Sequence, residues 1–476
     1  MAFNDELRAL FFVVAERAAA YRLSIDKAPQ RPLRSYPDMQ AQVNRPAPEL
    51  GLPGLSVIQE LAALAEPGLN AMVGPRFFGW VVGASHPVGV AVDWLTSAWG
   101  QNSGNHEATP AAAAVEENAA MWLLDILDLP RQASVGFVTG ATMANFVCLA
   151  AARSKVLRDN GWDVERFGLF GAPPINVLIG DDAHTTVFSA LQMLGLGRDR
   201  ICRVATDIAG RIRLASLRAS LVNCHGPTIV VSQAGQINTG AFDPVLQIVE
   251  ETIPRRVWLH IDGAFGLWAR ACPQKAHLTL GIDKADSWAV DGHKWLQAPY
   301  DCGYAIVAHP HDHRRSMTSH ASYLPLALDS ERAPSDFVPE LSRRARGFAT
   351  WALIRHFGRQ GIAEIVHRHC QLAQQMAEKL SEEPGVLVQN EVELNQLIVR
   401  FGTDENPQRG DELTEKVIAR VQAGGVCFVG GARWRQRWVM RISVISWPTT
   451  EDDANLSIAA IIEAWRSVSE ATTSTG

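Results

Sequence analysis

Between about residue 91 and residue 340, short apolar runs alternate with stretches of helical periodicity. This alternation predicts a mostly parallel sheet with helices on both faces, because strands of such a sheet are buried on two sides. The expected strands are Asn176–Gly180, Ile201–Val204, Thr228–Ser232 and Val257–Asp262, and the expected helices are Asn145–Arg153, Thr185–Leu194 and Val245–Thr252. The sequence therefore predicts an α/β fold.

Polar residues follow several of these strands at the point where each strand ends. Asp262 closes one apolar run, His184 comes shortly after another, and Lys294 follows the strand-like run that begins at Ser287. A further run, ending at Thr139, leads into the small-residue turn Thr139–Thr142. Because ligands bind at the carboxyl ends of parallel strands, we expect these side chains to meet at one edge of the sheet.

A lysine, an aspartate, a histidine and a small-residue turn are the components of a pyridoxal phosphate site. The amine of Lys294 can form the Schiff base, and a buried Asp262 can keep the pyridinium nitrogen protonated. The flat ring of His184 can stack on the cofactor ring. The turn Thr139–Thr142 precedes a helix, whose N-terminus favours an anion, and the Thr142 hydroxyl adds a donor for the phosphate.

Each of these residues also has a structural explanation. Asp262 can be a helix N-cap or a turn residue, and His184 can be a capping or core histidine. The small-residue turn alone is a weak signal, since it is neither a Walker nor a dinucleotide motif. Two neighbours add to the functional interpretation: Ala264 leaves room for a flat ring against the strand, and His293 can face the phosphate.

Composition excludes several classes of function. The 476 residues carry a net charge of −6, which gives no electrostatic case for nucleic acid or an anionic membrane. Seven scattered cysteines without a Cys-x-x-Cys pair fit a reducing cytoplasm. Charged residues interrupt the apolar N-terminal segment, so we expect no signal peptide and no membrane span. His309, His311 and His313 alternate without partner ligands, and we expect no metal.

Three regions are expected. Residues 1–90 contain a helix and a proline-rich stretch that cannot be regular structure, and we interpret them as an arm that packs across a dimer partner; a flexible leader is the alternative. Residues 91–345 form the large cofactor-binding domain, and residues 346–476 a small C-terminal α+β domain. Two long helices, Leu341–Phe357 and Gly361–Leu380, lead into the small domain.

Together these motifs resemble the group II pyridoxal-phosphate decarboxylases, which include aromatic-L-amino-acid, histidine and glutamate decarboxylases. The matching segments are Phe137–Asn145, Asp182–His184, Ala234–Pro244, His260–Ala264, Asp291–Leu296 and Ser342–Arg346. The ordered set is highly specific, although each piece alone is not. The resemblance implies the aspartate-aminotransferase type fold, called fold type I, and an obligate homodimer with the site at the interface.

The resemblance also implies roles for single residues. Lys294 carries the cofactor, Asp262 binds its ring nitrogen and His184 stacks on the ring. Ala141, Thr142, Asp291 and His293 hold the phosphate. The side-chain pocket of the family falls on the segment containing Phe77, Phe78 and Trp80. Because this segment is aromatic, we expect decarboxylation of an aromatic L-amino acid to the amine and CO₂.

The sequence departs from the family pattern in two places, of which the first loosens the match at the phosphate turn and the second affects the expected product. Met143 stands where members often have a glutamate. The stretch from Leu324 to Leu341 corresponds to the family's mobile catalytic loop, yet it lacks the tyrosine that protonates the carbanion. Pro334 falls at that position, Phe337 lies close by and Tyr323 lies just outside. Members without this tyrosine can divert the carbanion to oxygen and release an aldehyde.

Four alternatives therefore remain open. Decarboxylation coupled to oxidative deamination would give an aldehyde with peroxide and ammonia. A glutamate decarboxylase is less favoured by the aromatic segment. An aminotransferase of the same fold needs an arginine for the substrate carboxylate, and Arg441 is the candidate. A non-catalytic protein of this fold is disfavoured by the intact Lys294, Asp262 and His184. The sequence does not identify the substrate itself.

Overall fold

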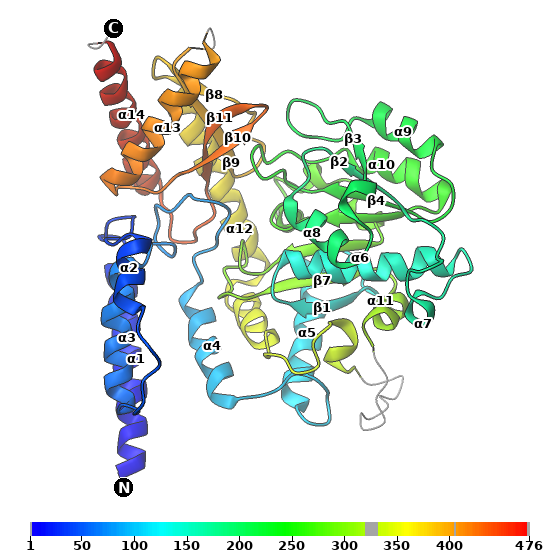
Figure 1. Cartoon of the computed structure of the whole chain (residues 1–476), viewed down its shortest axis with the longest axis horizontal. Helices are drawn as coiled ribbons and strands as arrows, with labels where there is room; N and C mark the ends of the chain where they lie inside the picture. Colours follow the sequence, from blue (N-terminus) through cyan, green and yellow to red (C-terminus); the bar gives the residue numbers. More distant parts are fainter. Residues whose placement is uncertain (1, 319–331, 404–405, 474–476) are drawn as a thin grey trace.

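The computed structural model describes residues 2–318, 332–403 and 406–473 (Figure 1). A group of N-terminal helices stands beside two sheet-containing parts, a large one with the central sheet and a small one near the C-terminus. No described helix is long and apolar enough to cross a membrane.

The central sheet has seven strands in the order β1-β7-β6-β5-β4-β2-β3. Neighbouring strands pair in parallel from β6 through β3, whereas β7 is antiparallel to both β1 and β6. The strands are β1 (Ser134–Val138), β2 (Asn176–Gly180), β3 (Cys202–Val204), β4 (Thr228–Gln233), β5 (Trp258–Asp262), β6 (Ser287–Asp291) and β7 (Gly303–Val307). The predicted mostly parallel sheet is confirmed.

Both faces of this sheet are covered, as the prediction required. Along β4, Val230 belongs to one apolar core and its neighbours Ile229 and Val231 to another, because successive side chains point to opposite faces. The covering helices are α5 (Pro110–Ile126), α6 (Ala141–Arg158), α7 (Val164–Phe167), α8 (Thr185–Met193), α9 (Leu214–Val222), α10 (Val245–Thr252) and α11 (Pro310–Met317). Helix α6 begins at Ala141, earlier than the expected Asn145, so the small-residue turn forms its first turn.

Helix α12 (Gly347–Ser381) joins the large part to the small one. Gly358 interrupts it with φ 60° and ψ 177°, which separates two helical halves much as predicted. The first half begins at Gly347 and not at Leu341, because Arg343 and Arg344 are tied to Glu116 and Asp93. The first half packs on α5 and on α4 (Pro87–Trp99), and α12 also packs on the small part.

The small part is a four-stranded antiparallel sheet in the order β10-β11-β9-β8 with helices on one side. Its strands are β8 (Val386–Val388), β9 (Gln396–Phe401), β10 (Gly430–Trp434) and β11 (Arg437–Ser443), and its helices are α13 (Pro407–Gly424) and α14 (Glu451–Thr473). An apolar core of its own unites these elements with the end of α12. The predicted small α+β architecture is thus present.

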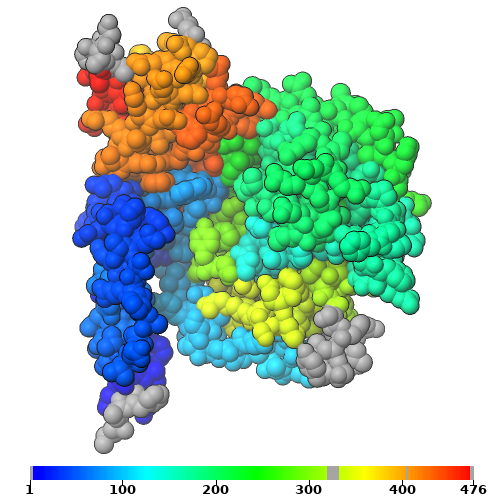
Figure 2. Space-filling view, in the orientation of Figure 1, coloured from blue at the N-terminus to red at the C-terminus, as the bar shows by residue number. Residues whose placement is uncertain are grey.

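The N-terminal segment forms α1 (Ala2–Ser24), α2 (Tyr36–Val43) and α3 (Gly54–Ala65), which stand as a column beside the body (Figure 2). The prediction that the proline-rich stretch has no regular structure is wrong at α2. Ser35 caps this helix, and Pro37 lies in its first turn. Proline is tolerated there because the first amides of a helix have no intrahelical acceptor.

Candidate active site

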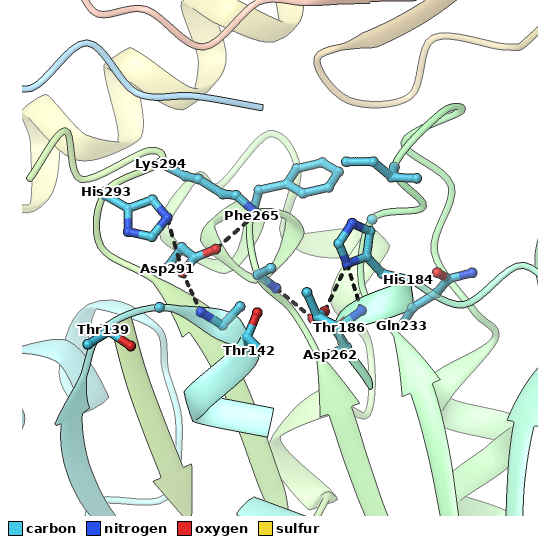
Figure 3. A pocket seen from close by; sticks show the side chains of 15 residues that line it. Thr139, Thr142, His184, Thr186, Gln233, Asp262, Phe265, Asp291, His293 and Lys294 are labelled. Atoms are coloured by element: carbon cyan, nitrogen blue, oxygen red, sulfur yellow. Dashed lines mark hydrogen bonds and ion pairs between the residues drawn. The ribbon is translucent and has the colours of Figure 1, made fainter. Parts of the chain in front are cut away.

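A cavity of about 280 Å³ opens at the carboxyl ends of β1, β4, β5 and β6 (Figure 3). All eight residues predicted to hold the cofactor line it: Ala141, Thr142, His184, Asp262, Ala264, Asp291, His293 and Lys294. They come from segments far apart in the sequence, and the parallel sheet brings them together because its strand ends share one edge.

Lys294 lies in the turn that follows β6, where its amine meets a carboxylate. Its Nζ is 2.9 Å from Asp291 Oδ2, and it also lies 5.7 Å from the centroid of the Phe265 ring. The side chain of Lys294 is only 15% exposed. The amine therefore lies inside the cavity, between a negative charge and an aromatic face.

Asp262 ends β5 and is buried at the floor of the cavity. Burial raises the pKa of its carboxyl, while His184 and Lys294 act in the opposite direction. Oδ1 accepts one weak hydrogen bond from the Ala264 amide at 3.3 Å. Asp262 therefore also acts as a turn residue, the structural explanation considered from the sequence. A buried carboxylate with this single contact suits a cationic donor such as a protonated ring nitrogen.

His184 both caps α8 and lines the cavity. Its Nδ1 accepts the Thr186 amide at 3.4 Å and lies 2.8 Å from Thr186 Oγ1. An amide can only donate, so in the neutral ring the proton belongs on Nε2, which points away from Thr186 (Figure 3). Burial lowers the pKa of His184, which favours this neutral form.

The first turn of α6 provides the concave surface for an anion. The Ala141 amide donates to Asp291 Oδ1 at 2.6 Å. The amides of Thr142 and Met143 have no intrahelical acceptor because they lie in the first turn of the helix. A Cβ on Gly140 would approach His293 to 3.0 Å, so a larger residue would narrow this space. The cavity thus has the donors and the room that a phosphate at a helix N-terminus needs.

Asp291 was predicted among the phosphate-holding residues, and its contacts define how it can act. A carboxylate only accepts hydrogen bonds, and Asp291 accepts from the Ala141 amide while it pairs with Lys294. His293 Nε2 lies 3.4 Å from Asp291 Oδ1, and burial lowers the pKa of this histidine. Asp291 therefore contacts the Ala141 amide, His293 and Lys294, and as a carboxylate it cannot donate a hydrogen bond to an anion.

Five lining residues were not singled out from the sequence: Thr186, Gln233, Gly235, Ile237 and Phe265. A signal was present for Gln233, which is the last residue of β4 and thus lies at a strand end like Asp262. Phe265 follows Asp262 closely, but no periodicity distinguishes a cavity-facing phenylalanine from a core one. Phe265 and Ile237 give the cavity its apolar wall.

The structure does not bring Phe77 or Phe78 to this cavity. Phe78 is 0% exposed in the core of the small part, and Phe77 is 1% exposed and stacks on Phe428 with centroids 4.8 Å apart. Their aromatic rings are occupied by protein contacts, and sequence alone cannot separate such rings from pocket-lining ones. Trp80 is 55% exposed, and its contact with a substrate stays a prediction.

Two arginines considered for the substrate differ in their partners. Arg76 Nη1 pairs with Asp453 Oδ1 at 2.8 Å, so its charge is already balanced. Arg441, on β11, has Nε and Nη2 buried without a hydrogen-bond partner among the described residues. Burial lowers the pKa of Arg441 to about 10, and its charge also lowers the pKa of His184. Arg441 is therefore an available cation beside the cavity.

The predicted loop falls partly outside the described residues. Tyr323 and residues 324–331 belong to that undescribed part. Pro334–Phe337 form a short 3₁₀ helix, η7, that packs on β1 and α11, and its residues do not line the cavity. Asp336 pairs with Arg314 at 2.9 Å. No proton donor therefore reaches the cavity from residues 332–341 of the same chain.

The sequence matches the model of the pyridoxal-dependent decarboxylase conserved domain over residues 37–403. The chain belongs to this family. It is accordingly an amino-acid decarboxylase, a carboxy-lyase whose cofactor is pyridoxal 5′-phosphate.

Relatives within the family differ in their substrates. The aromatic-L-amino-acid decarboxylase of Bacillus atrophaeus is 27% identical over 399 residues, which cover 82% of this chain and 81% of the relative. The L-2,4-diaminobutyrate decarboxylase of Rhizobium meliloti is also 27% identical, over 97% of this chain and 91% of the relative.

The fold agrees with that of a solved structure. The crystal structure of Rhodiola rosea 4-hydroxyphenylacetaldehyde synthase superposes with a TM-score of 0.87 at 22% identity, covering 97% of this chain and 98% of the other. At this identity the likeness establishes the shared fold. The predicted fold-type I architecture is confirmed.

Proposed function

We propose that this enzyme decarboxylates an aromatic L-amino acid to the corresponding amine. The convergence of Lys294, Asp262, His184 and the first turn of α6 on one cavity is the observation that carries the proposal. Bound pyridoxal phosphate supplies an electron-withdrawing ring that accepts the electrons of the bond to the departing carboxylate. The remaining tasks fall to side chains of this chain.

Each side chain has a defined task in this proposal. Lys294 bonds the cofactor and is displaced by the substrate amine, a step that its place inside the cavity permits. Asp262 holds a proton on the ring nitrogen, and the turn Ala141–Thr142 binds the phosphate with the help of His293. Ala264 leaves space for the flat ring, and His184 covers its other face.

His184 and Arg441 are placed to orient the substrate carboxylate. A carboxylate leaves most easily when its bond stands perpendicular to the cofactor ring, and fixed donors hold that geometry. Nε2 of His184 offers a hydrogen bond, and the guanidinium of Arg441 has buried donors without a partner among the residues that the structure describes. The same arginine would serve an aminotransferase, but the family model that this chain matches is that of a pyridoxal-dependent decarboxylase domain.

The apolar wall of the cavity leads us to propose an aromatic substrate. Phe265 and Ile237 line it, whereas a glutamate side chain would place a second carboxylate in the cavity. Arg76 cannot neutralise that charge because it is paired with Asp453, and Arg441 is needed for the first carboxylate.

We expect kcat/KM for tryptophan, tyrosine, phenylalanine or a hydroxylated derivative to exceed that for glutamate by at least ~10-fold, since burying an unpaired carboxylate costs more than ~1.4 kcal/mol. Carbon dioxide release from a panel of L-amino acids measures this. Diaminobutyrate belongs in the panel because one relative acts on it. A preference for glutamate or aspartate would contradict the proposed substrate class.

The product is proposed to be the amine, with the aldehyde as the alternative. After carbon dioxide leaves, the α-carbon must receive a proton, and no phenol from residues 332–341 reaches the cavity. His184 or a water held in the closed cavity would supply it. The aldehyde route stays a candidate because an aldehyde synthase shares this fold.

The same reactions run in air and under nitrogen separate the two products. We expect an amine yield that does not depend on oxygen, with neither peroxide nor ammonia. An oxygen-dependent aldehyde, with peroxide and ammonia in proportion, would establish the alternative.

We further propose that the enzyme is a homodimer joined by its arm, residues 1–90, with the cavity at the interface. Large apolar side chains are exposed along the arm: Leu7, Phe11, Phe12, Leu23, Leu33, Tyr36, Val43, Leu50, Leu52, Val57 and Leu61. Such a surface needs a partner. The Gly83 amide, near the end of the arm, donates to the carbonyl of His293, a residue that lines the cavity, at 3.1 Å. The arm therefore reaches the cavity, and a partner subunit packed on this end of the arm would lie close to it.

Replacing Phe11 and Phe12 by aspartate should convert the dimer into a monomer in sedimentation velocity, because two charges would enter an apolar interface. Phe11 and Phe12 are 62% and 68% exposed in the single chain. Phe170→Asp is the matched control, because Phe170 is 98% exposed but lies on the large part. A dimer that survives the double substitution would contradict the role of the arm.

A cytoplasmic location completes the proposal. None of the seven cysteines, all of which lie in the described ranges, is paired in a disulfide. Free thiols fit a reducing compartment, where disulfides do not persist.

A further inference from the structure

Gln297 lies in the turn after Lys294 and is 0% exposed. Its Nε2 donates to the backbone carbonyls of Lys294 at 2.9 Å and Ile445 at 2.8 Å, with a longer third contact to the Trp295 carbonyl at 3.4 Å. Its Oε1 accepts from the amides of Ala84 at 2.9 Å and Trp447 at 3.3 Å. One side chain therefore joins the turn that carries Lys294 to the end of the arm and to the segment following β11.

Only a carboxamide can make this set of bonds. The four shorter contacts need two N–H donors and one oxygen that accepts twice, which is the complete capacity of a glutamine side chain. A glutamate of the same length would keep the two accepted bonds and lose both donated ones. A methionine of similar size would lose all four.

The backbone of the turn is held as firmly as the side chain. Gln297 adopts φ 59°, a left-handed conformation that is uncommon outside glycine, and such conformations persist where their surroundings fix them. The carbonyl of Gln297 accepts the His86 amide at 2.8 Å, and the Ala298 amide closes the turn on Gly292 at 3.0 Å. The position of this turn thus depends on contacts from two other parts of the chain.

We propose that Gln297 is a positioning residue that sets the place of the Lys294 amine according to how the arm segment and the small part are seated. The lysine side chain has four rotatable bonds between its backbone and its amine. The hydrogen bond from Gln297 to the Lys294 carbonyl fixes the backbone from which this side chain extends. Reactions at an amine are sensitive to displacements of about 1 Å, which can cost ~100-fold in rate. This inference rests on the proposed role of Lys294.

The first test replaces the donors without removing the side chain. Gln297→Glu and Gln297→Met should each lower kcat by ~10–100-fold while KM changes by less than about threefold, because substrate contacts are intact and the amine is misplaced. Asn176→Asp is the matched control. Asn176 is a carboxamide that also donates to two carbonyls, of His225 at 3.0 Å and Pro227 at 3.3 Å, but it begins β2, at the edge of the sheet opposite the cavity.

A second test uses the wild-type enzyme and needs no variant to fold. Coupling between two sites is reciprocal, so removing the cofactor from Lys294 should loosen the segments that Gln297 holds. Hydrogen exchange at the amides of Ala84 and Trp447 should therefore be faster in the cofactor-free protein than in the holoenzyme. The Leu127 amide, which donates to Leu123 within α5 at 2.9 Å, should exchange equally in both.

Two results would overturn the inference. One is a kcat of Gln297→Met within about twofold of the wild-type value. The other is a hydrogen-exchange rate at the Ala84 and Trp447 amides that is the same with and without the cofactor. If Asn176→Asp lost activity equally, the effect of the Gln297 variants would be general destabilisation, and this result would also overturn the inference. Failure of the proposed function has a separate signature, since a reduced cofactor attached to another lysine would disprove the role of Lys294 whatever the Gln297 variants do.

Discussion

Lys294→Ala should abolish turnover and the visible absorption of the bound cofactor. The alanine variant has no amine to bond the cofactor or to be displaced by the substrate amine, so we expect kcat to fall by more than ~10⁴-fold. The cavity offers no substitute, because Lys294 is the only lysine among its lining residues in the described part of the chain. Absorption spectra and carbon dioxide release measure the two effects.

Reduction with borohydride identifies the bonded lysine directly. Peptide mapping of the reduced wild-type enzyme should place the cofactor on the peptide that contains Lys294. Lys284→Ala is a suitable control, since Lys284 is exposed and lies outside the cavity. It should retain the spectrum and full activity. Label on any other lysine would disprove the assignment.

Asp262→Asn should keep the cofactor and lose activity by ~10³-fold or more. An amide of the same shape cannot hold a proton on the ring nitrogen, so the ring withdraws electrons poorly when the carboxylate leaves. The cofactor should remain because Lys294 and the first turn of α6 are untouched. Spectroscopic titration of bound cofactor and kcat measure the two outcomes.

A control for Asp262 must also be a buried carboxylate. Asp312 is 4% exposed and contacts Arg158 on the far side of the large part, away from the cavity. Asp312→Asn should lower thermal stability with little change in kcat. Activity of Asp262→Asn within about threefold of wild type would refute its role, because that corresponds to under ~1 kcal/mol of barrier.

Local sequence patterns were sufficient for the main elements and for most of the site. Strand β2 and helix α10 have the predicted bounds, because their apolar periodicities are unambiguous over short windows. The eight expected cofactor residues line one cavity, because polar residues at the carboxyl ends of parallel strands share an edge of the sheet. These predictions needed only the order of strands and turns along the chain.

Other features depend on which distant segments meet. The sequence could not place Phe77 and Phe78, since an aromatic side chain fits a protein core as well as a ligand pocket. Helix α2 was missed because proline excludes helix interiors but not first turns. The pairing of Lys294 with Asp291 is local in sequence, but its burial comes from the surrounding strands.

Chain order and residue type by themselves determined the α/β sheet, its cofactor chemistry and the lysine, aspartate and histidine at its strand ends. Tertiary structure alone decided that Arg441 has donors without a partner in the described part of the chain, that Arg76 is paired with Asp453, and that Gln297 joins three segments. Periodicity reports the face that each element buries, whereas hydrogen bonding and charge balance depend on partners hundreds of residues away.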